Sequence, residues 1–119
     1  MNIQTYKIMA KRLKQGNTWI PTFAITEDDV AMDCTNYTVV MYIKASLSES
    51  AAAVQTLSAN WTDRTGGEGY FNLTNAMSKA LDLDKYWYEI ILYTTADSSV
   101  VATLEQDKIR VVASLEKDF

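Results

Sequence analysis

The sequence predicts an all-β protein, an antiparallel β-sandwich of seven or eight short strands with one short helix near residues 74–83. Runs in which apolar and polar residues alternate, the period of a β-strand, recur along the chain and are rich in Val, Ile, Tyr and Thr. Turn residues separate these runs at intervals of ~8–12 residues, a spacing typical of sandwiches. Helical periodicity appears in one segment alone, so the sequence lacks the strand–helix alternation that would predict a parallel sheet.

A single domain over residues 1–119 is expected from the length and composition. The chain has no internal repeat and no linker-like stretch, and 48% of its residues are hydrophobic and 22% charged. Such a chain can bury a core without metals or disulfides. No apolar run reaches the ~18–20 residues that span a bilayer, and residues 1–13 lack the apolar stretch of a secretory signal. We therefore expect no membrane association, and folding in a cytoplasm.

Two strands are expected before residue 30. Residues 6–13 alternate and end at a turn that contains glycine and asparagine. Residues 18–26 form the second expected strand, which Pro21 interrupts. Because proline cannot donate a hydrogen bond to a neighbouring strand, this strand either lies at a sheet edge or begins near Pro21.

Residues 36–45 carry the clearest strand pattern in the first half of the chain. One of its faces is apolar and consists of Tyr37, Val39, Met41, Ile43 and Ala45. The strand is therefore expected to line the core with that face. Residues 54–61 alternate more weakly and predict a further strand, which ends at a glycine-containing turn over residues 63–67.

The one helical segment follows a short strand expected over residues 69–73. Thr74 or Asn75 can cap the helix, because either side chain can accept a hydrogen bond from the first helical turn. The apolar residues that recur at helical spacing are Met77, Ala80 and Leu81. The helix spans about ten residues at most, or two to three turns.

The last third of the chain predicts three strands. Residues 86–94 alternate with both faces largely apolar, so this strand is expected at the centre of a sheet. Residues 97–99 form a hairpin turn. Residues 100–105 and 109–115 are expected as two strands separated by a polar turn at residues 106–108. The side chains expected to face the core in the last strand are Ile109, Val111, Ala113 and Leu115.

Several kinds of chemistry are excluded by composition. The sequence has no histidine, so histidine bases, Ser-His or Cys-His nucleophiles and histidine metal ligands cannot occur. Cys34 is the only cysteine, so neither an internal disulfide nor a multi-cysteine zinc site can form. We expect Cys34 to be a small buried residue, and we expect no catalytic residue, no metal site and no cofactor.

An acidic cluster has two interpretations. Glu27, Asp28, Asp29 and Asp33 lie in a loop between two expected strands. Several carboxylates on one loop could bind calcium, but the spacing lacks the pattern of a calcium-binding loop. A solvated hairpin turn is the favoured interpretation.

Positive charge gathers in the first 14 residues. The four basic residues Lys7, Lys11, Arg12 and Lys14 precede any acidic residue. They could dock on the acidic residues Glu27, Asp28 and Asp29 of a neighbouring copy or partner, or they could be the solvated face of a strand. A DNA-binding arm is disfavoured by the net charge of −4.

Aromatic residues offer a third candidate site. Trp19, Trp61 and Trp87, with Tyr42 and Tyr93, could form an exposed platform that stacks on sugars. Sandwich strands also bury aromatic side chains, because each removes a large apolar area from water. The second interpretation, a place in the core or at a subunit interface, is favoured.

Four segments together resemble a known family. They are Gln15-Gly16-Asn17-Thr18, Asp33-Cys34-Thr35-Asn36, Gly69-Tyr70-Phe71-Asn72 and Tyr86-Trp87-Tyr88-Glu89-Ile90. Each combines a turn or strand pattern that resembles the small immunoglobulin-like β-sandwich domains of tailed-phage and prophage virion proteins. The resemblance runs from about Gly16 to Leu115 and involves no catalytic signature.

The resemblance implies an immunoglobulin-like sandwich and a non-catalytic role in the structure or assembly of a phage or prophage particle, as a tail, neck or baseplate component. It implies other virion proteins as partners, self-association or attachment to a ring, and no nucleic-acid ligand. The protein would reside in the virion and, during assembly, in the bacterial host cytoplasm. The alternative is a carbohydrate- or protein-binding module that uses exposed Trp and Tyr side chains.

Overall fold

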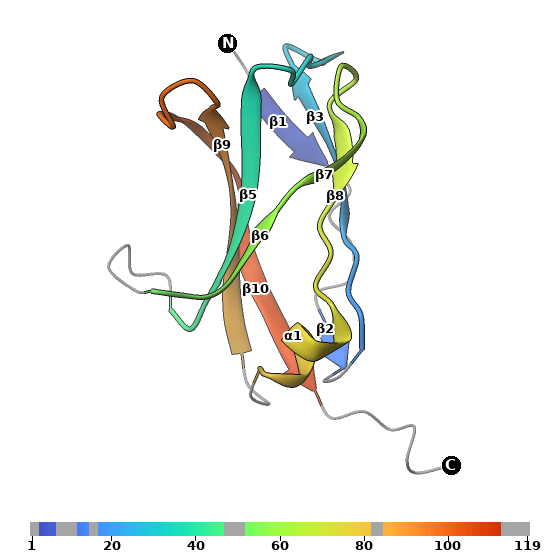
Figure 1. Ribbon diagram of the computed structural model, residues 1–119, viewed down its shortest axis with the longest axis vertical. Helices are drawn as coiled ribbons and strands as arrows, with labels where there is room; N and C mark the ends of the chain where they lie inside the picture. Colours follow the sequence, from blue (N-terminus) through green and yellow to red (C-terminus); the bar gives the residue numbers. More distant parts are fainter. Residues whose placement is uncertain (1–2, 7–11, 15–16, 47–51, 82–84, 113–119) are drawn as a thin grey trace.

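Two five-stranded β-sheets pack face to face in the computed structural model, which describes residues 3–6, 12–14, 17–46, 52–81 and 85–112 (Figure 1). The elements are β1 (Ile3–Tyr6), β2 (Arg12–Lys14), β3 (Thr22–Glu27), β4 (Val30–Ala31), β5 (Tyr37–Lys44), β6 (Ala53–Ser58), β7 (Asn60–Asp63), β8 (Glu68–Tyr70), α1 (Asn75–Lys79), β9 (Lys85–Thr94) and β10 (Val100–Val112). The all-β sandwich predicted from the sequence is confirmed. No helix in these ranges is long and apolar enough to cross a membrane.

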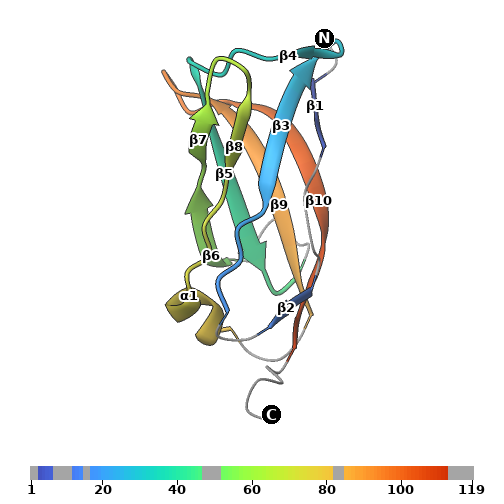
Figure 2. The ribbon, with the colours of Figure 1, turned by 90° about the vertical axis from the view of Figure 1, so that its right-hand side faces the viewer.

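The strand order is that of an immunoglobulin-like sandwich. The first sheet has the order β1-β3-β8-β7, with β4 paired to β3, and the second has the order β2-β10-β9-β5-β6. This arrangement places the same strands side by side as the two sheets of immunoglobulin domains. The ladders are antiparallel except for β2, which runs parallel to β10. Figure 2 shows the first sheet in front of the second.

The core lies between the sheets and is built by alternate residues. In β5 and β9, which are paired along their length, these residues are Val39, Met41, Ile43, Tyr88, Ile90 and Leu92, all at most 1% exposed. Phe23 and Ile25 face them from the first sheet. Residues of opposite parity on β5 and β9 are half-buried on the outer face. The predicted core strands at residues 36–45 and 86–94, and the central position of the second, are confirmed, but Tyr37 is half-buried and Ala45 lies beyond the end of β5 and is exposed.

Two predicted strands each divide between the sheets. The two ends of the predicted strand at residues 6–13 lie in different sheets, because β1 pairs with β3 in the first sheet and β2 pairs with β10 in the second; residues 7–11 lie outside the described residues. Residues 54–61 likewise contribute β6 to the second sheet and β7 to the first. The break falls at Ala59, whose N–H still donates to the Val39 carbonyl at 3.0 Å. The alternating pattern alone does not reveal such a change of sheet, because every second side chain points into the core both before and after the change.

The predicted turn at residues 106–108 is wrong, because β10 continues through it from Val100 to Val112. The polar residues remain in the strand because they have partners on β9. Gln106 Nε2 donates to Glu89 Oε2 at 3.2 Å, and Lys108 Nζ lies 5.2 Å from the centre of the Trp87 ring. Two irregularities of register interrupt the first half of β10. The inward positions of Ile109 and Val111 are confirmed, and Ala113 and Leu115 lie outside the described residues.

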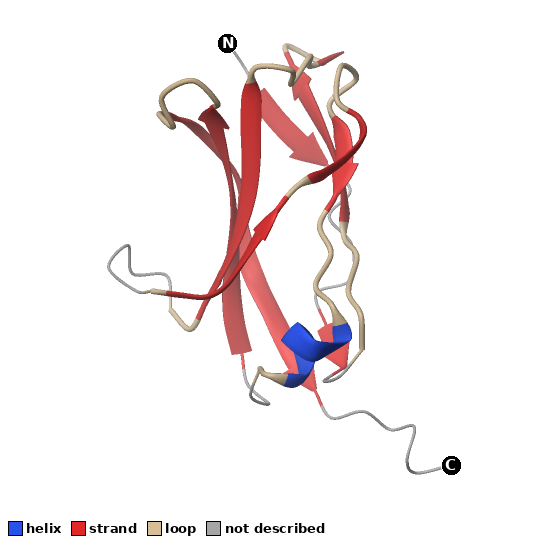
Figure 3. Cartoon of the chain, viewed as in Figure 1, coloured by secondary structure: helices blue, strands red, loops and turns tan. Residues whose placement is uncertain are grey.

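Local signals at Pro21 and Thr74 position two further elements. Strand β3 begins directly after Pro21 and lies between β1 and β8, so of the two expectations the start near Pro21 is correct. The Pro21 carbonyl accepts from the Phe71 N–H at 3.0 Å. The helix is shorter than expected and spans Asn75–Lys79 (Figure 3). Thr74 caps it, since its Oγ1 accepts from the Met77 N–H at 3.3 Å.

Candidate interaction surface

The outer face of the second sheet carries the most developed side-chain network outside the core. It is formed by the residues of β5 and β9 that alternate with the core residues, together with residues of β10. We call it the aromatic face; its residues are Thr38, Val40, Tyr42, Lys44, Trp87, Glu89, Ile91, Tyr93, Gln106 and Lys108. In the part of the chain that the structure describes, no strand or helix covers it (Figure 1).

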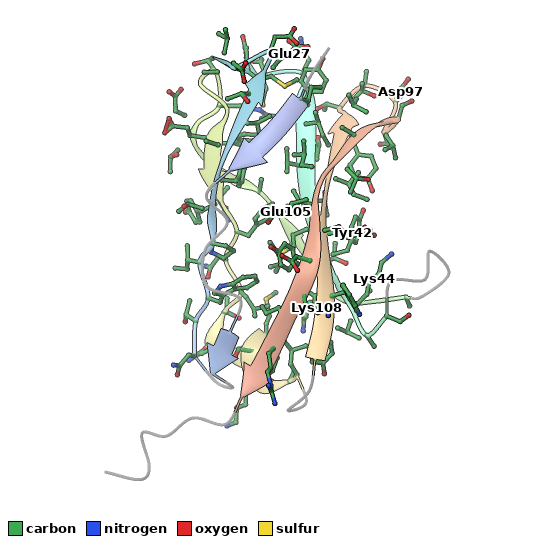
Figure 4. All side chains as sticks on the ribbon, turned by 180° about the vertical axis from the view of Figure 1, so that it is seen from behind. Glu27, Tyr42, Lys44, Asp97, Glu105 and Lys108 are labelled. Carbon is green, nitrogen blue, oxygen red and sulfur yellow. The ribbon has the colours of Figure 1, made fainter. Side chains whose placement is uncertain are left out.

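Two of the three charged residues on the aromatic face, Lys44 and Glu89, are paired with each other. Lys44 Nζ lies 2.8 Å from Glu89 Oε1, and the two side chains are only 14% and 17% exposed. Because Gln106 donates to the other oxygen of Glu89, this carboxylate has partners on both neighbouring strands. Figure 4 shows Lys44 and Lys108 on this face. If another protein covered this face, few charged groups would lose their water without keeping a partner.

Aromatic side chains make up much of the remaining area. The hydroxyls of Tyr42 and Tyr93 lie 2.8 Å apart and share a hydrogen bond, and Lys44 Nζ is 5.9 Å from the centre of the Tyr42 ring. Burial, followed by the hydrogen bond with Tyr42, raises the pKa of Tyr93 to about 12. Tyr93 therefore remains protonated at physiological pH, and the aromatic face stays uncharged at this point.

A shallow depression of about 290 Å³ lies at the end of the aromatic face near the β9–β10 turn. It is lined by Thr38, Val40, Tyr42, Tyr93, Thr94 and Ser98. Hydroxyl groups dominate its polar lining, and none of these six side chains is charged. Such a surface can hydrogen-bond a neutral polar group or lie under an apolar one.

The three tryptophans occupy three different environments. Trp19 is buried, with its ring edge-on to Tyr88 at 6.2 Å between centroids. Trp61 is half-buried against Phe23 at 5.5 Å. Trp87 alone belongs to the aromatic face. The structure therefore does not bring the three indoles together into one platform, and Tyr42 and Tyr93 accompany Trp87 instead.

The acidic cluster forms a hairpin turn, as the favoured interpretation had it. Asp28 and Asp29 have positive φ angles of 52° and 66° and join β3 to β4. The two strands pair next to this turn, with Glu27 opposite Val30. Asp33 lies beyond β4 and accepts from the Thr35 N–H at 2.9 Å; hydrogen bonds from Thr35 lower its pKa. Among the described residues, no three acidic or cysteine side chains are arranged to hold a metal ion.

Of the four basic residues, Arg12 and Lys14 lie far from the acidic cluster in one copy of the chain. Arg12 and Lys14 belong to β2, near the end of the molecule opposite the labelled Glu27 (Figure 4). The long dimension of the molecule is 48 Å. Lys7 and Lys11 lie outside the described residues. Contact of Arg12 or Lys14 with the acidic cluster would therefore require another copy or a partner.

Arg64 is a structural residue that the sequence did not single out. Its Nε donates to the Cys34 carbonyl at 3.0 Å and its Nη2 to the Tyr37 carbonyl at 2.7 Å. The guanidinium also lies 5.3 Å from the centre of the Trp61 ring. Arg64 thus ties the β7–β8 turn of one sheet to the start of β5 in the other. Its position in a turn between Asp63 and Thr65 gave no signal of this role.

Cys34 is fully buried beside this junction, as expected from the sequence. Burial raises the pKa of its thiol to about 11, and the nearby Asp33 adds to the rise. The thiol is therefore protonated and shielded at physiological pH. Such a cysteine is a poor nucleophile.

Comparisons with known proteins identify the fold. No family model matches the sequence, and a search of curated protein sequences found no match. A solved structure, the N-terminal domain of phage TP901-1 ORF48, is similar with a TM-score of 0.54. The similarity covers 89% of this chain and 85% of that one at 6% sequence identity. At this identity the likeness shows a shared sandwich architecture.

Proposed function

We propose that this chain is a non-catalytic structural protein of a phage or prophage particle, a component of its tail, neck or baseplate. The observation that supports the proposal is the fold shared with the N-terminal domain of a phage protein over almost the full length of both chains. The turn and strand motifs that resemble tailed-phage virion domains support the same assignment from the sequence alone. Fold alone leaves function open, so the proposal rests on the two together.

The chemistry of the side chains supports a role in contact rather than in catalysis. The sequence has no histidine, and its one cysteine is buried with a raised pKa. The aromatic face offers what protein interfaces use, namely Tyr and Trp side chains around a largely paired set of charges. Its partner would be another virion protein, met in the host cytoplasm during assembly.

A second candidate function is a carbohydrate-binding module. The observation that favours it is the uncharged, hydroxyl-lined depression beside the paired hydroxyls of Tyr42 and Tyr93. Tyrosine rings can stack on a sugar while threonine and serine hydroxyls bond to it. Titration of the protein with neutral monosaccharides, followed by NMR shifts at Tyr42 and Tyr93, separates this function from the first.

The assembly role is tested by deleting the gene and restoring it with variants. Without the protein, we expect particles that lack a defined part in electron micrographs. Trp87→Ala should restore assembly poorly, because it removes an aromatic anchor from the aromatic face. Val30→Ala is the matched control, since Val30 is 67% exposed on the other sheet and should restore assembly fully. Normal particles from the deletion strain would contradict the proposal.

A further inference from the structure

Strand β6 is an open edge of the second sheet. It pairs with β5 on one side and is the last strand of its sheet in the described part of the chain. Its six residues, Ala53–Ser58, include no charged residue and no proline. Val54 is 45% exposed, and Thr56 and Ser58 are also exposed. An uncharged edge of this kind is a template for another strand.

The direction of the free hydrogen-bonding groups follows from one contact. Ala59 N–H donates to the carbonyl of Val39, the residue directly opposite it. In an antiparallel pair, hydrogen-bonded and non-hydrogen-bonded positions alternate. Leu57 therefore turns its backbone groups toward β5, whereas Thr56 and Ser58 turn theirs away from the sheet. The groups that a further strand would need lie at exposed residues.

The other sheet edges differ from β6. Strand β2 has three residues, two of them basic, and β7 has four residues and ends at Asp63. Strand β1 also has four residues and lies against β10 of the opposite sheet. Short edges, charged residues and cover by another element are the usual means of protecting an edge. Strand β6 has none of these three features among the described residues, and the one register shift in its ladder with β5 lies at its start, before Gln55.

We propose that two copies of this chain associate through antiparallel pairing of β6 with β6, around a two-fold axis at Thr56. The two second sheets then form one continuous ten-stranded sheet. In this register Thr56 faces Thr56 of the second copy, and Val54 faces Ser58 on the same outer side. Leu57 and Gln55 face each other on the core side, so both sandwiches keep their inner faces inward.

A second copy is the occupant because β6 is self-complementary. Each copy carries a net charge of −4, yet no like charges meet along a strand that has none. The outward side chains at the seam are small, so two copies of the strand can approach to the spacing of a normal ladder. A two-fold pairing also closes after one step, whereas pairing of β6 with a different edge would lead to rings or open chains of many copies. The proposal stands on the strand itself and goes beyond the proposed role in a phage particle.

Disulfide capture tests the register. Thr56→Cys places two thiols directly opposite each other, within the Cα separation of about 4.4–6.8 Å that a disulfide requires. Val54→Cys is the matched control, because it is on the same strand and face but faces Ser58. Buried Cys34 remains inert in both. Under mild oxidation we expect Thr56→Cys to become a covalent dimer and Val54→Cys to remain monomeric. The reverse pattern, or no dimer from Thr56→Cys at high concentration, would overturn the proposal.

Sedimentation of the untagged protein tests the association itself. We expect a concentration-dependent dimer that is insensitive to salt, because the seam carries no charge. Thr56→Pro should abolish the dimer, since proline removes an N–H that points away from β5. Thr56→Val should keep it, because its backbone donor and β-branched shape are retained. A strict monomer at every concentration would overturn the proposal, and the particle experiment above would remain a separate test of the function.

Discussion

Replacing Ile90 with Ala tests which face of the second sheet is the inside of the molecule. Ile90 is fully buried on β9, opposite Met41 of β5. The change removes three buried carbon atoms, which at about 0.8 kcal/mol each account for about 2.4 kcal/mol. The cavity left in a closely packed core adds to this loss. We expect the free energy of unfolding to fall by about 3–4 kcal/mol.

Ile91 provides a control in the same strand. It is the same residue type, one position further along β9, but it lies half-buried on the aromatic face. Both substitutions remove the same atoms from the same central strand, so the difference between them reports the burial and packing of the two faces. Urea denaturation should show a loss of about 0.5–1.5 kcal/mol for Ile91→Ala. Equal losses, or a larger loss at Ile91, would show that the sheet has been assigned the wrong inner face.

Three further predictions concern Arg64, alkaline pH and the basic segment. Arg64→Lys should lower the free energy of unfolding by about 1–3 kcal/mol in urea denaturation, because lysine cannot donate to two carbonyls in the same fork; an unchanged midpoint would contradict this role. Burial raises the pKa of Cys34 from 9.0 to about 11 and that of Tyr93 from 10.0 to about 12, so the unfolded chain loses these protons first. Stability should be intact below pH 9.0 and decline through about pH 12 in thermal melts, and a rise over that window would contradict the assignment. If the basic residues dock on the acidic cluster of a neighbouring copy, light scattering should show an associated species that weakens as salt rises, and Lys11→Glu combined with Arg12→Glu should remove it. If this double variant leaves assembly into particles unchanged, the basic residues are only solvated.

The core could be predicted because its signal is local. In β5 the burial of each side chain follows the alternation, so the predicted inward residues Val39, Met41 and Ile43 are buried, whereas Tyr37 and Ala45 at its two ends are half-buried and exposed. The cap at Thr74 and the start of β3 after Pro21 also depend on single residues and their neighbours. These features follow from backbone geometry and hydrophobic burial alone.

The remaining features depend on residues distant in sequence. The change of sheet at Ala59 leaves the alternation intact, so only the pairing with Val39 reveals it. The sequence predicts a turn at Gln106 and Lys108 because their partners, Glu89 and Trp87, lie 17 and 21 residues earlier in the chain. Polar residues in a strand are stabilised by such neighbours, which a local pattern does not contain.

The candidate surface could be predicted only in part for the same reason. Trp87, Tyr42 and Tyr93 are expected together with Trp19 and Trp61, whereas the fold keeps the first three on one face and places the other two elsewhere. The pairing of Lys44 with Glu89 likewise requires the register of β5 against β9. Residue type alone indicates what a side chain can contact, and the register decides what it does contact.

The most direct test of the proposed role is quantitative mass spectrometry of particles purified on a density gradient from the bacterium that carries this gene. A structural component should stay with the particles through the gradient and be present at a fixed ratio to their major proteins in every preparation. Absence of the protein from intact particles, or a ratio that follows the contaminating host proteins, would contradict a role in the particle.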